Sequence, residues 1–287
     1  MPHLLALGFG FSAKALAARL DRRAWQVTGT ARTEAGCAAM TAAGVDAWLW
    51  PGGPMPDLST VTHVLSSVPP TAEGDAAHAF LHTTPLPSLA WAGLLSTTGV
   101  YGDHGGAWVD ETTPLVPSGH RGGLRATQNA AWMTLYETRD LPLHIFRLAG
   151  IYGPGRSALD RMRDGTARRI VKPGQVFSRI HVADIAETVL QSFARPNPGQ
   201  AYNLADDLPA PPQDVIAEAA RLLGLPKPPD LPFETAPLSP MARSFYADNK
   251  RISNARIKAE LGVRLRYPDY FRGLAAILAR EAGRDGA

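Results

Sequence analysis

The sequence has little that would suit an oxidising compartment or a membrane. It contains one cysteine, Cys37, so no disulfide can form within the chain. Its first residues lack the basic segment and the apolar stretch of a secretory signal. No apolar run approaches the ~20 residues that are needed to cross a bilayer. We therefore expect a cytoplasmic protein with no membrane partner.

The sequence also lacks a strong charge of either sign. Its formal net charge is +3 over 287 residues, and 45% hydrophobic against 19% charged residues is typical of a globular chain. The basic residues are scattered except for arginines at positions 161, 163, 168 and 169, which we interpret as a solvated helix face rather than a nucleic-acid patch. The histidines show no metal-ligand spacing. We expect neither a nucleic-acid partner nor a metal site.

What the sequence does contain is a regular alternation of strand and helix signals in its N-terminal half. Short apolar or β-branched runs are typical of buried strands, and the alanine- and leucine-rich stretches between them favour helices. Such alternation indicates βαβ units and therefore α/β class, with a doubly wound, mostly parallel Rossmann sheet. The expected strands are residues 4–7, 26–30, 47–50, 63–68, 91–96 and 143–148, and the expected helices are residues 13–20, 33–43, 75–81 and 124–139.

The pattern changes after Gly150. A Gly-Pro-Gly sequence interrupts the chain at residues 153–155, and residues 209–240 are dense in proline. Helices are expected at residues 184–193, 214–223, 252–261 and 270–282, and a strand at 202–204 looks like a return to the sheet. We predict a Rossmann domain over residues 1–154 with a return segment at about 178–205. A smaller α/β substrate domain would take residues 155–177 and 206–287.

A glycine-rich turn joins the first expected strand to the first expected helix. Residues 8–13 have the pattern G-x-G-x-x-A. Gly8 permits a tight turn, Gly10 lets a pyrophosphate approach the backbone, and Ala13 allows close packing of helix and strand. Because the motif stands between a strand and a helix, we predict dinucleotide binding rather than a turn alone. The predicted contacts are Gly8, Gly10, Phe11, Ser12 and Ala13.

The end of the second strand distinguishes the two nicotinamide dinucleotides. NAD enzymes usually carry an acidic residue there, which accepts hydrogen bonds from the ribose 2′-hydroxyl. Here residues 28–33 at the end of the strand contain no carboxylate, and the first one after them is Glu34. Arg32 can instead meet a 2′-phosphate with paired hydrogen bonds, and Thr30 and Thr33 add hydroxyls. We predict NADP rather than NAD, with an ordinary surface role for Arg32 as the alternative.

Four segments along the chain form a recognisable set. They are residues 8–13, Leu95-Ser96-Thr97-Thr98-Gly99-Val100-Tyr101-Gly102, Arg147-Leu148-Ala149-Gly150-Ile151-Tyr152-Gly153-Pro154-Gly155 and Ile180-His181-Val182-Ala183-Asp184-Ile185-Ala186. Together they resemble the extended short-chain dehydrogenase/reductase family, the NAD(P)-dependent epimerases and dehydratases, over most of the chain. The resemblance implies an active-site hydroxyl at Thr97. It also implies cofactor contacts at Ser67, Val68, Ala149 and Gly150.

The sequence lacks the Tyr-x-x-x-Lys pair on which that family's chemistry rests. Arg121 takes the place of the tyrosine and Arg125 the place of the lysine. Arginine stays protonated near neutral pH, so Arg121 cannot exchange a proton there, whereas Arg125 can still hold a ribose or phosphate. The nearest substitutes for acid–base work are His120 and Tyr101. A solvent-facing Arg121 is the alternative, and the resemblance is to an atypical branch.

Two further absences bear on the substrate. The acidic pair of the family's sugar dehydratases is replaced by Thr98 and Gly99. The arginine by which many epimerases hold a diphosphate is replaced by Phe177, although Arg179 is close by in sequence. The predicted substrate contacts are Arg179 and Tyr152. The predicted substrate is a small polar metabolite, anionic or a nucleotide sugar.

Three functions remain open from the sequence. The leading hypothesis is an NADP-dependent oxidoreductase or epimerase-like enzyme with a non-standard active site. The main alternative is a non-catalytic NADP(H)-binding sensor, and the third is an epimerase with relocated catalytic groups. Dimers of the family that the chain resembles usually pair two long helices from each subunit, one of which lies between the fourth and fifth strands. Here Gly74 and the prolines at 69, 70, 85 and 87 leave room for only a short helix in that connection. We therefore expect a monomer or a weak homodimer.

Overall fold

The computed structural model describes residues 1–285, which form two compact units. The first unit comprises Met1–Thr97, Gly123–Arg147 and Ile185–Tyr202. The second comprises Thr98–Gly122, Leu148–Asp184 and the described residues from Asn203 onward. The two units are similar in length because the second takes in the segment that follows Thr97. The domain limits expected from the sequence stay a prediction.

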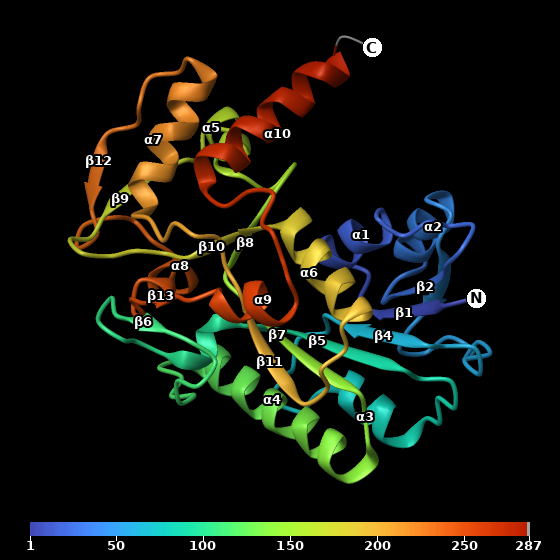
Figure 1. Ribbon diagram of the computed structural model, residues 1–287. Helices are drawn as coiled ribbons and strands as arrows, with labels where there is room; N and C mark the ends of the chain where they lie inside the picture. Colours follow the sequence, from blue (N-terminus) through green and yellow to red (C-terminus); the bar gives the residue numbers. More distant parts are fainter. Residues whose placement is uncertain (286–287) are drawn as a thin grey trace. The chain divides into compact units, whose positions relative to one another are not determined.

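A seven-stranded parallel sheet forms the centre of the fold, as the sequence predicts. Its strands are β1 (His3–Leu7), β2 (Gln26–Ala31), β3 (Asp46–Leu49), β4 (His63–Ser66), β5 (Trp91–Thr97), β7 (Leu143–Leu148) and β11 (Gln200–Leu204). Their order is β11-β7-β5-β4-β1-β2-β3 (Figure 1). Leu5 of β1 pairs with Thr28 of β2 on one side and with Val64 of β4 on the other. All five residues of β1 are buried, which explains the continuous apolar run in its sequence.

Helices cover both faces of this sheet in the first unit. They are α1 (Phe11–Ala17), α2 (Glu34–Ala42), α3 (Ala76–Thr83), α4 (His120–Arg139) and α6 (Val182–Ala194). Most of α4 lies with α3 on one face, and α1, α2 and most of α6 lie on the other (Figure 1). Phe80 of α3 and Trp132 of α4 are buried against Leu94 of β5 in one apolar core. Burial of such aromatic side chains is a main source of stability, since each removes ~150–250 Å² from water.

Short elements and two small cores make up the second unit. Its elements are the 3₁₀ helix η1 (Thr98–Tyr101), the strands β6 (Trp108–Val109), β8 (Gly150–Tyr152), β9 (Arg169–Val171), β10 (Arg179–His181), β12 (Asp230–Pro232) and β13 (Arg251–Ile252), and the helices α5 (Ala158–Arg163), α7 (Pro212–Leu223), α8 (Pro240–Phe245), α9 (Ala255–Glu260) and α10 (Tyr270–Asp285). The strands form three two-stranded parallel ladders, β10-β8, β12-β9 and β13-β6. One core joins α5, α7 and α10 through Leu159, Ile216 and Leu274.

The structure corrects several of the expected helix boundaries, and two of the corrections have a clear physical reason. The helix expected at residues 252–261 begins only at Ala255, because Arg251 and Ile252 pair with β6 as a short strand. The long helix expected from residue 124 already begins at His120. Glycines at positions 122 and 123 lower helix propensity, so the helical pattern in the sequence is recognisable only from residue 124.

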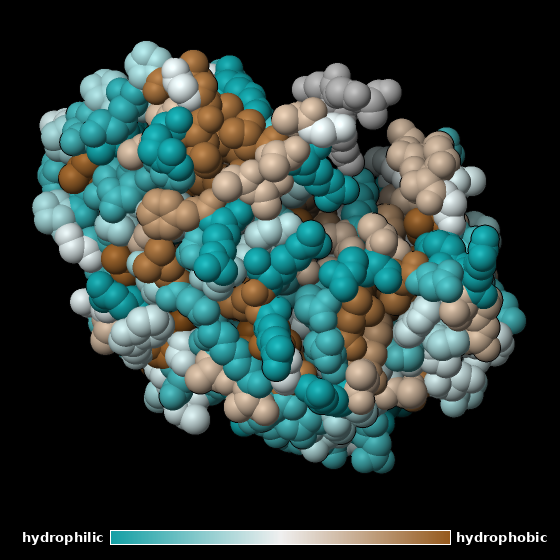
Figure 2. Space-filling view, turned by 45° about the horizontal axis from the view of Figure 1, so that its top comes forward, coloured by the Kyte–Doolittle hydropathy of each residue, from teal (hydrophilic) through white to brown (hydrophobic). Residues whose placement is uncertain are grey.

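Polar residues dominate the surface that Figure 2 presents, with hydrophobic residues in small groups between them. The large hydrophobic side chains that are exposed in the second unit include Trp108, Val116, Met241 and Phe245. Over residues 1–285, we find no helix with both the length and the apolar character to cross a membrane.

Candidate functional site

The glycine-rich turn is held by hydrogen bonds from two neighbouring strands. Gly8 has a φ of +82°, a left-handed conformation that favours glycine. Its N–H donates to Oγ1 of Thr30 over 2.8 Å, and its carbonyl accepts from Oγ of Ser67 over 2.6 Å. A Cβ at Gly8 would stand 2.8 Å from that Ser67 oxygen. The ends of β1, β2 and β4 therefore fix the turn, and Thr30 and Ser67 act as its supports.

Gly10 differs from Gly8 because the fold gives no reason for a glycine there. Its φ is −88°, an ordinary value for any residue. A Cβ at this position would meet no atom within 4 Å. Behind it Ser12 and Ala13 are buried, whereas Phe11 is half-buried. The open space beside Gly10 is what a dinucleotide pyrophosphate requires, so the turn fits such a group.

Arg32 follows β2 as an exposed side chain. Its guanidinium makes no ion pair or hydrogen bond among residues 1–285, so it can meet an anion. Thr33 accepts a hydrogen bond from the N–H of Gly36 and caps α2. Thr30 is buried and supports Gly8, so its hydroxyl serves the turn rather than the surface.

Arg125 lies in a network that links α4 to the end of β4. Its guanidinium donates to Oε1 of Gln128 over 2.8 Å and to the carbonyl of Leu95 over 3.3 Å. Gln128 in turn donates to the carbonyl of Val68 and to Asp75. These bonds fix the direction of the Arg125 guanidinium.

Two of the predicted catalytic residues flank η1. Thr97 is half-buried at the end of β5 and belongs to the first unit. Tyr101 belongs to the second unit, is fully buried, and donates from its hydroxyl to Oδ1 of Asn203 over 2.8 Å. This geometry favours a structural role for Tyr101.

His120 and Arg121 begin α4 in the second unit, and both are exposed. The guanidinium carbon of Arg121 lies 5.9 Å from the ring centre of Phe245, within the range of a cation–π contact. No carboxylate pairs with Arg121 among residues 1–285. Phe245 could not be predicted from the sequence, because a contact across more than a hundred residues leaves no local pattern.

A buried lysine fastens the loop that leads into α4. Nζ of Lys250 donates to the carbonyl of Gly102 over 2.6 Å and lies 3.0 Å from a carboxylate oxygen of Asp248. The other oxygen of Asp248 accepts from the hydroxyl of Ser118. The chain just before His120 is therefore tied down by residues that sequence analysis did not single out.

The third and fourth segments of the sequence pattern lie side by side in the β8–β10 ladder, where Gly150 pairs with Arg179. The N–H of Ala149 donates to Leu204, and that of Gly150 donates to Ser178. Tyr152 is buried, and its hydroxyl donates to the carbonyl of Asp269. Burial raises the pKa of Tyr152 above its ordinary value. Tyr152 therefore has the environment of a core residue.

Arg179 is half-buried, and its Nη1 donates to the backbone carbonyls of Phe177 and Ala210 over 2.8 and 3.1 Å. Burial lowers the pKa of Arg179, and the charge of Arg161 lowers it further. The nearby acid is Asp206, which is 1% exposed and whose Oδ2 has no hydrogen-bond partner in the described structure. Burial raises the pKa of Asp206 to about 8, against the influence of Arg179. Near neutral pH the Asp206 carboxyl therefore does not fully neutralise the charge of Arg179.

Comparison with known proteins identifies relatives of this chain and the fold that it shares with solved structures. No protein-family model matches the sequence. Protein YeeZ of Escherichia coli K12 is 28% identical over 289 aligned residues, which cover 94% of this chain and 97% of that protein. The dTDP-glucose 4,6-dehydratase of Bacillus anthracis, solved in complex with NAD, has a TM-score of 0.74 at 14% identity, and the match covers 99% of this chain and 98% of the dehydratase. Solved 4-epimerases of UDP-sugars share the fold.

The solved structure of a conserved protein from Silicibacter pomeroyi DSS, described as functionally unknown, is more similar. It is 51% identical, with a TM-score of 0.92, and the match covers 98% of this chain and 99% of that one. The chain therefore belongs to the same family as the Silicibacter pomeroyi protein, and it has the Rossmann fold of the NAD-dependent epimerases and dehydratases.

Proposed function

We propose that the chain binds NADP(H) at the turn of residues 8–13. The observation that carries the proposal is Gly10, where the backbone is ordinary and the space of a side chain is open. A glycine that neither conformation nor packing requires is explained by a ligand that approaches the backbone. The supports of Gly8 hold the turn in one shape, so little ordering is needed on binding.

The preference for NADP over NAD rests on Arg32. It is exposed, follows the second strand, and has no acidic partner in the part of the chain that the structure describes. A guanidinium can bind the 2′-phosphate through two parallel hydrogen bonds, whereas the 2′-hydroxyl of NAD offers it no charge.

Calorimetric titration with NADPH and with NADH tests this preference. We expect NADPH to bind at least about tenfold more tightly, because a charged hydrogen bond contributes about 1.5–3 kcal/mol. Arg32→Ala should remove most of that difference by weakening NADPH alone. Arg23→Ala, an exposed arginine just before β2, is the matched control and should leave both affinities unchanged. Equal affinities for the two dinucleotides in the parent protein would overturn the preference.

The chemistry proposed for the site is a reductase or epimerase-like reaction on an anionic metabolite. Bound NADPH would supply a hydride. Arg121 would hold a carboxylate or phosphate of the substrate, and Thr97 would donate a hydrogen bond to its carbonyl oxygen. Arg179 supports an anionic substrate as well, since burial raises the pKa of Asp206, the carboxyl that faces it, to about 8. With Arg121 at the tyrosine position, His120 stays the proposed acid–base residue.

The second candidate is a sensor that binds NADP(H) without turnover, and the missing Tyr-x-x-x-Lys pair favours it. Loss of NADPH absorbance in the presence of keto acids, phosphorylated carbonyl compounds and nucleotide sugars separates the two functions. An enzyme of the proposed kind should turn over an anionic carbonyl compound, and Arg121→Ala should raise its KM. Tight NADPH binding with no turnover across the panel would favour the sensor.

A further inference from the structure

The structure contains one conspicuously exposed tryptophan. Of the six tryptophans, Trp48, Trp91 and Trp132 are buried and two others are half-buried, whereas Trp108 is 59% exposed. It makes no aromatic or cation–π contact within residues 1–285. Exposing an indole to water is unfavourable, so a free indole at the edge of a hollow points to a ligand that covers it.

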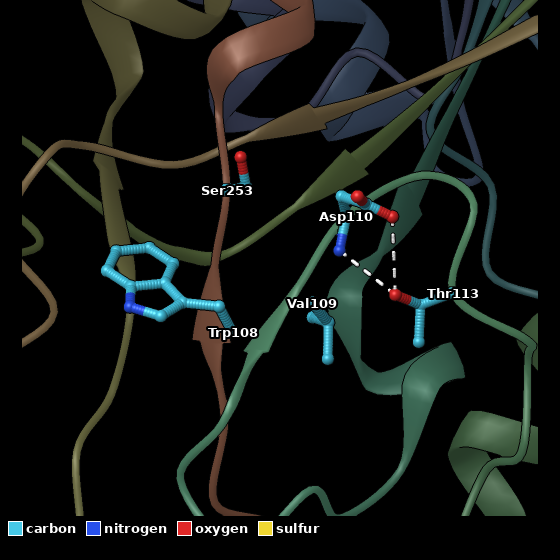
Figure 3. A pocket seen from close by; sticks show the side chains of 5 residues that line it. All are labelled: Trp108, Val109, Asp110, Thr113 and Ser253. Carbon is cyan, nitrogen blue, oxygen red and sulfur yellow. Dashed lines mark hydrogen bonds between the residues drawn. The ribbon is translucent and has the colours of Figure 1, made fainter.

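A hollow of about 260 Å³ lies beside this indole in the second unit, lined by Trp108, Val109, Asp110, Thr113 and Ser253. Figure 3 shows the indole on one side and the Asp110–Thr113 pair on the other, with Val109 and Ser253 between them. Trp108 is the first residue of β6, and Asp110 directly follows that strand. The volume is slightly below the ~300 Å³ at which ligand pockets usually begin, so the hollow suits one small ring.

The walls of the hollow are fixed before any ligand arrives. Val109 and Ile252 are each 2% exposed and anchor the β6–β13 ladder from the inner face. The N–H of Ser253 donates to the carbonyl of Val109 over 2.9 Å. The N–H of Asp110 donates to Oγ1 of Thr113 over 3.1 Å. A site of this kind loses little conformational entropy on binding.

The polar groups of the hollow offer both donors and acceptors. Oδ1 of Asp110 accepts from Thr112 and Thr113, whereas its Oδ2 has no protein partner in the described structure. Hydrogen bonds from Thr112 lower the pKa of Asp110, so it stays an acceptor near neutral pH. The hydroxyl of Ser253 can donate to a ligand, since the bond that it makes here is as an acceptor from Ala255.

The charges around the hollow select neither a cation nor an anion. Asp110 is the one charged residue that lines it. Arg251 stands beside Trp108 across the ladder and donates to the carbonyl of Gly106. One acid and one base next to an aromatic face suit a neutral ligand with several hydroxyl groups and an apolar C–H face.

We propose that this hollow binds a single neutral sugar ring, which stacks on the Trp108 indole and hydrogen-bonds to Asp110 and Ser253. The methyl glycosides of glucose, galactose and mannose are suitable probes, and saturation-transfer NMR with the full chain detects their binding. We expect a dissociation constant of about 1–10 mM for at least one glycoside, as is reasonable for one stacked ring and two or three hydrogen bonds.

Matched variants distinguish this site from incidental contact. Trp108→Ala should weaken glycoside binding at least about tenfold, and Trp108→Phe should keep part of it, since an aromatic face remains. Asp110→Asn should weaken binding several-fold. Phe271→Ala is the control, because Phe271 is another exposed aromatic residue of the same unit and lies outside the hollow. Replacing the exposed Trp108 should leave the melting temperature unchanged.

Three results would overturn the proposal: no saturation transfer from any glycoside, equal binding by the parent and Trp108→Ala, or choline binding more tightly than every glycoside. The last would identify a cation site formed by Trp108 and Asp110. The inference does not rest on the proposed cofactor, and an NADPH titration of Trp108→Ala reports on cofactor binding separately.

Discussion

At the scale of single residues, the burial of one carboxyl group has the clearest consequence. Asp206 is 1% exposed, and its Oδ2 lacks a hydrogen-bond partner among the described residues. Burial raises its pKa from 3.8 to about 8. Between pH 3.8 and about pH 8 the folded state therefore keeps the proton of Asp206, whereas the unfolded state has released it. Stability falls as the pH rises through that window, because ionising Asp206 in place becomes increasingly costly.

Asp206→Asn should remove this cost. The amide keeps an oxygen for the N–H of Leu208 and carries no charge. We expect the variant to exceed the parent in free energy of unfolding by about 1–3 kcal/mol at pH 8.5, and the difference to shrink at pH 5, where the parent carboxyl is protonated in the folded state. Urea unfolding at both pH values measures it. A parent that is more stable than the variant at pH 8.5 would show that the ionised Asp206 is stabilised.

Contacts between individual side chains were also the least predictable feature from the sequence. It identified Gly8, Gly10 and Arg32 from their places around a strand, a turn and a helix. Phe245 and Lys250 carried no signal, because their partners Arg121 and Gly102 are more than a hundred positions away. The environments of Tyr101 and Tyr152 were hidden for the same reason. Their hydroxyls donate to Asn203 and Asp269, which only the tertiary structure brings to them.

At the scale of elements, the strands of the sheet were predictable because burial on both faces produces apolar runs. The two-residue strands β6 and β13 were not, since two residues establish no period and Ile252 suits a helix as well as a strand. The start of α4 was also missed. Its first turn contains two glycines, and in the structure only the first of them is required by a close neighbour.

Gly122 and Gly123 make a matched pair within α4. A Cβ at Gly122 would lie 2.8 Å from the carbonyl oxygen of Gly99 at η1, whereas a Cβ at Gly123 would meet nothing within 4 Å. Gly122→Ala should lower the free energy of unfolding by about 1–3 kcal/mol, because backbone must move. Gly123→Ala should raise it by about 0.5–1 kcal/mol through helix propensity. Equal effects in thermal unfolding would mean that α4 does not approach η1 as described.

At the scale of the whole molecule, the buried titratable groups predict where stability is greatest. Burial lowers the pKa of His63, His144 and His181 from 6.5 to about 4. Between those values the unfolded state binds more protons, so these histidines make stability rise with pH. Asp206 acts in the opposite direction up to about pH 8. Below pH 6.5 these three histidines outweigh Asp206, and above it Asp206 continues to lower the stability as the pH rises toward 8.

We therefore expect maximal stability near pH 6.5. Each net proton changes the free energy of unfolding by about 1.4 kcal/mol per pH unit, so the fall toward pH 4.5 should reach several kcal/mol and exceed the fall toward pH 8.5. Urea unfolding across this range gives the profile. A maximum at pH 8 or above would contradict it.

The fold class was predictable because the alternation of strands and helices, the glycine-rich turn and the four-segment resemblance all indicate one architecture. The activity was not, because function belongs to the site rather than the fold, and here the site departs from the family it resembles at Arg121 and Arg125. Cofactor binding is the claim on which the remaining proposals about the turnover site depend.

Gly10→Ala tests that claim most directly, because the structure predicts opposite effects on fold and ligand. Its φ is ordinary and its side-chain space is open, so the free energy of unfolding should stay within about 0.5 kcal/mol of the parent. The added Cβ stands where the pyrophosphate must approach, so calorimetry should show NADPH affinity reduced at least about tenfold. Unchanged NADPH affinity in an equally stable variant, or no NADPH binding by the parent, would contradict the account.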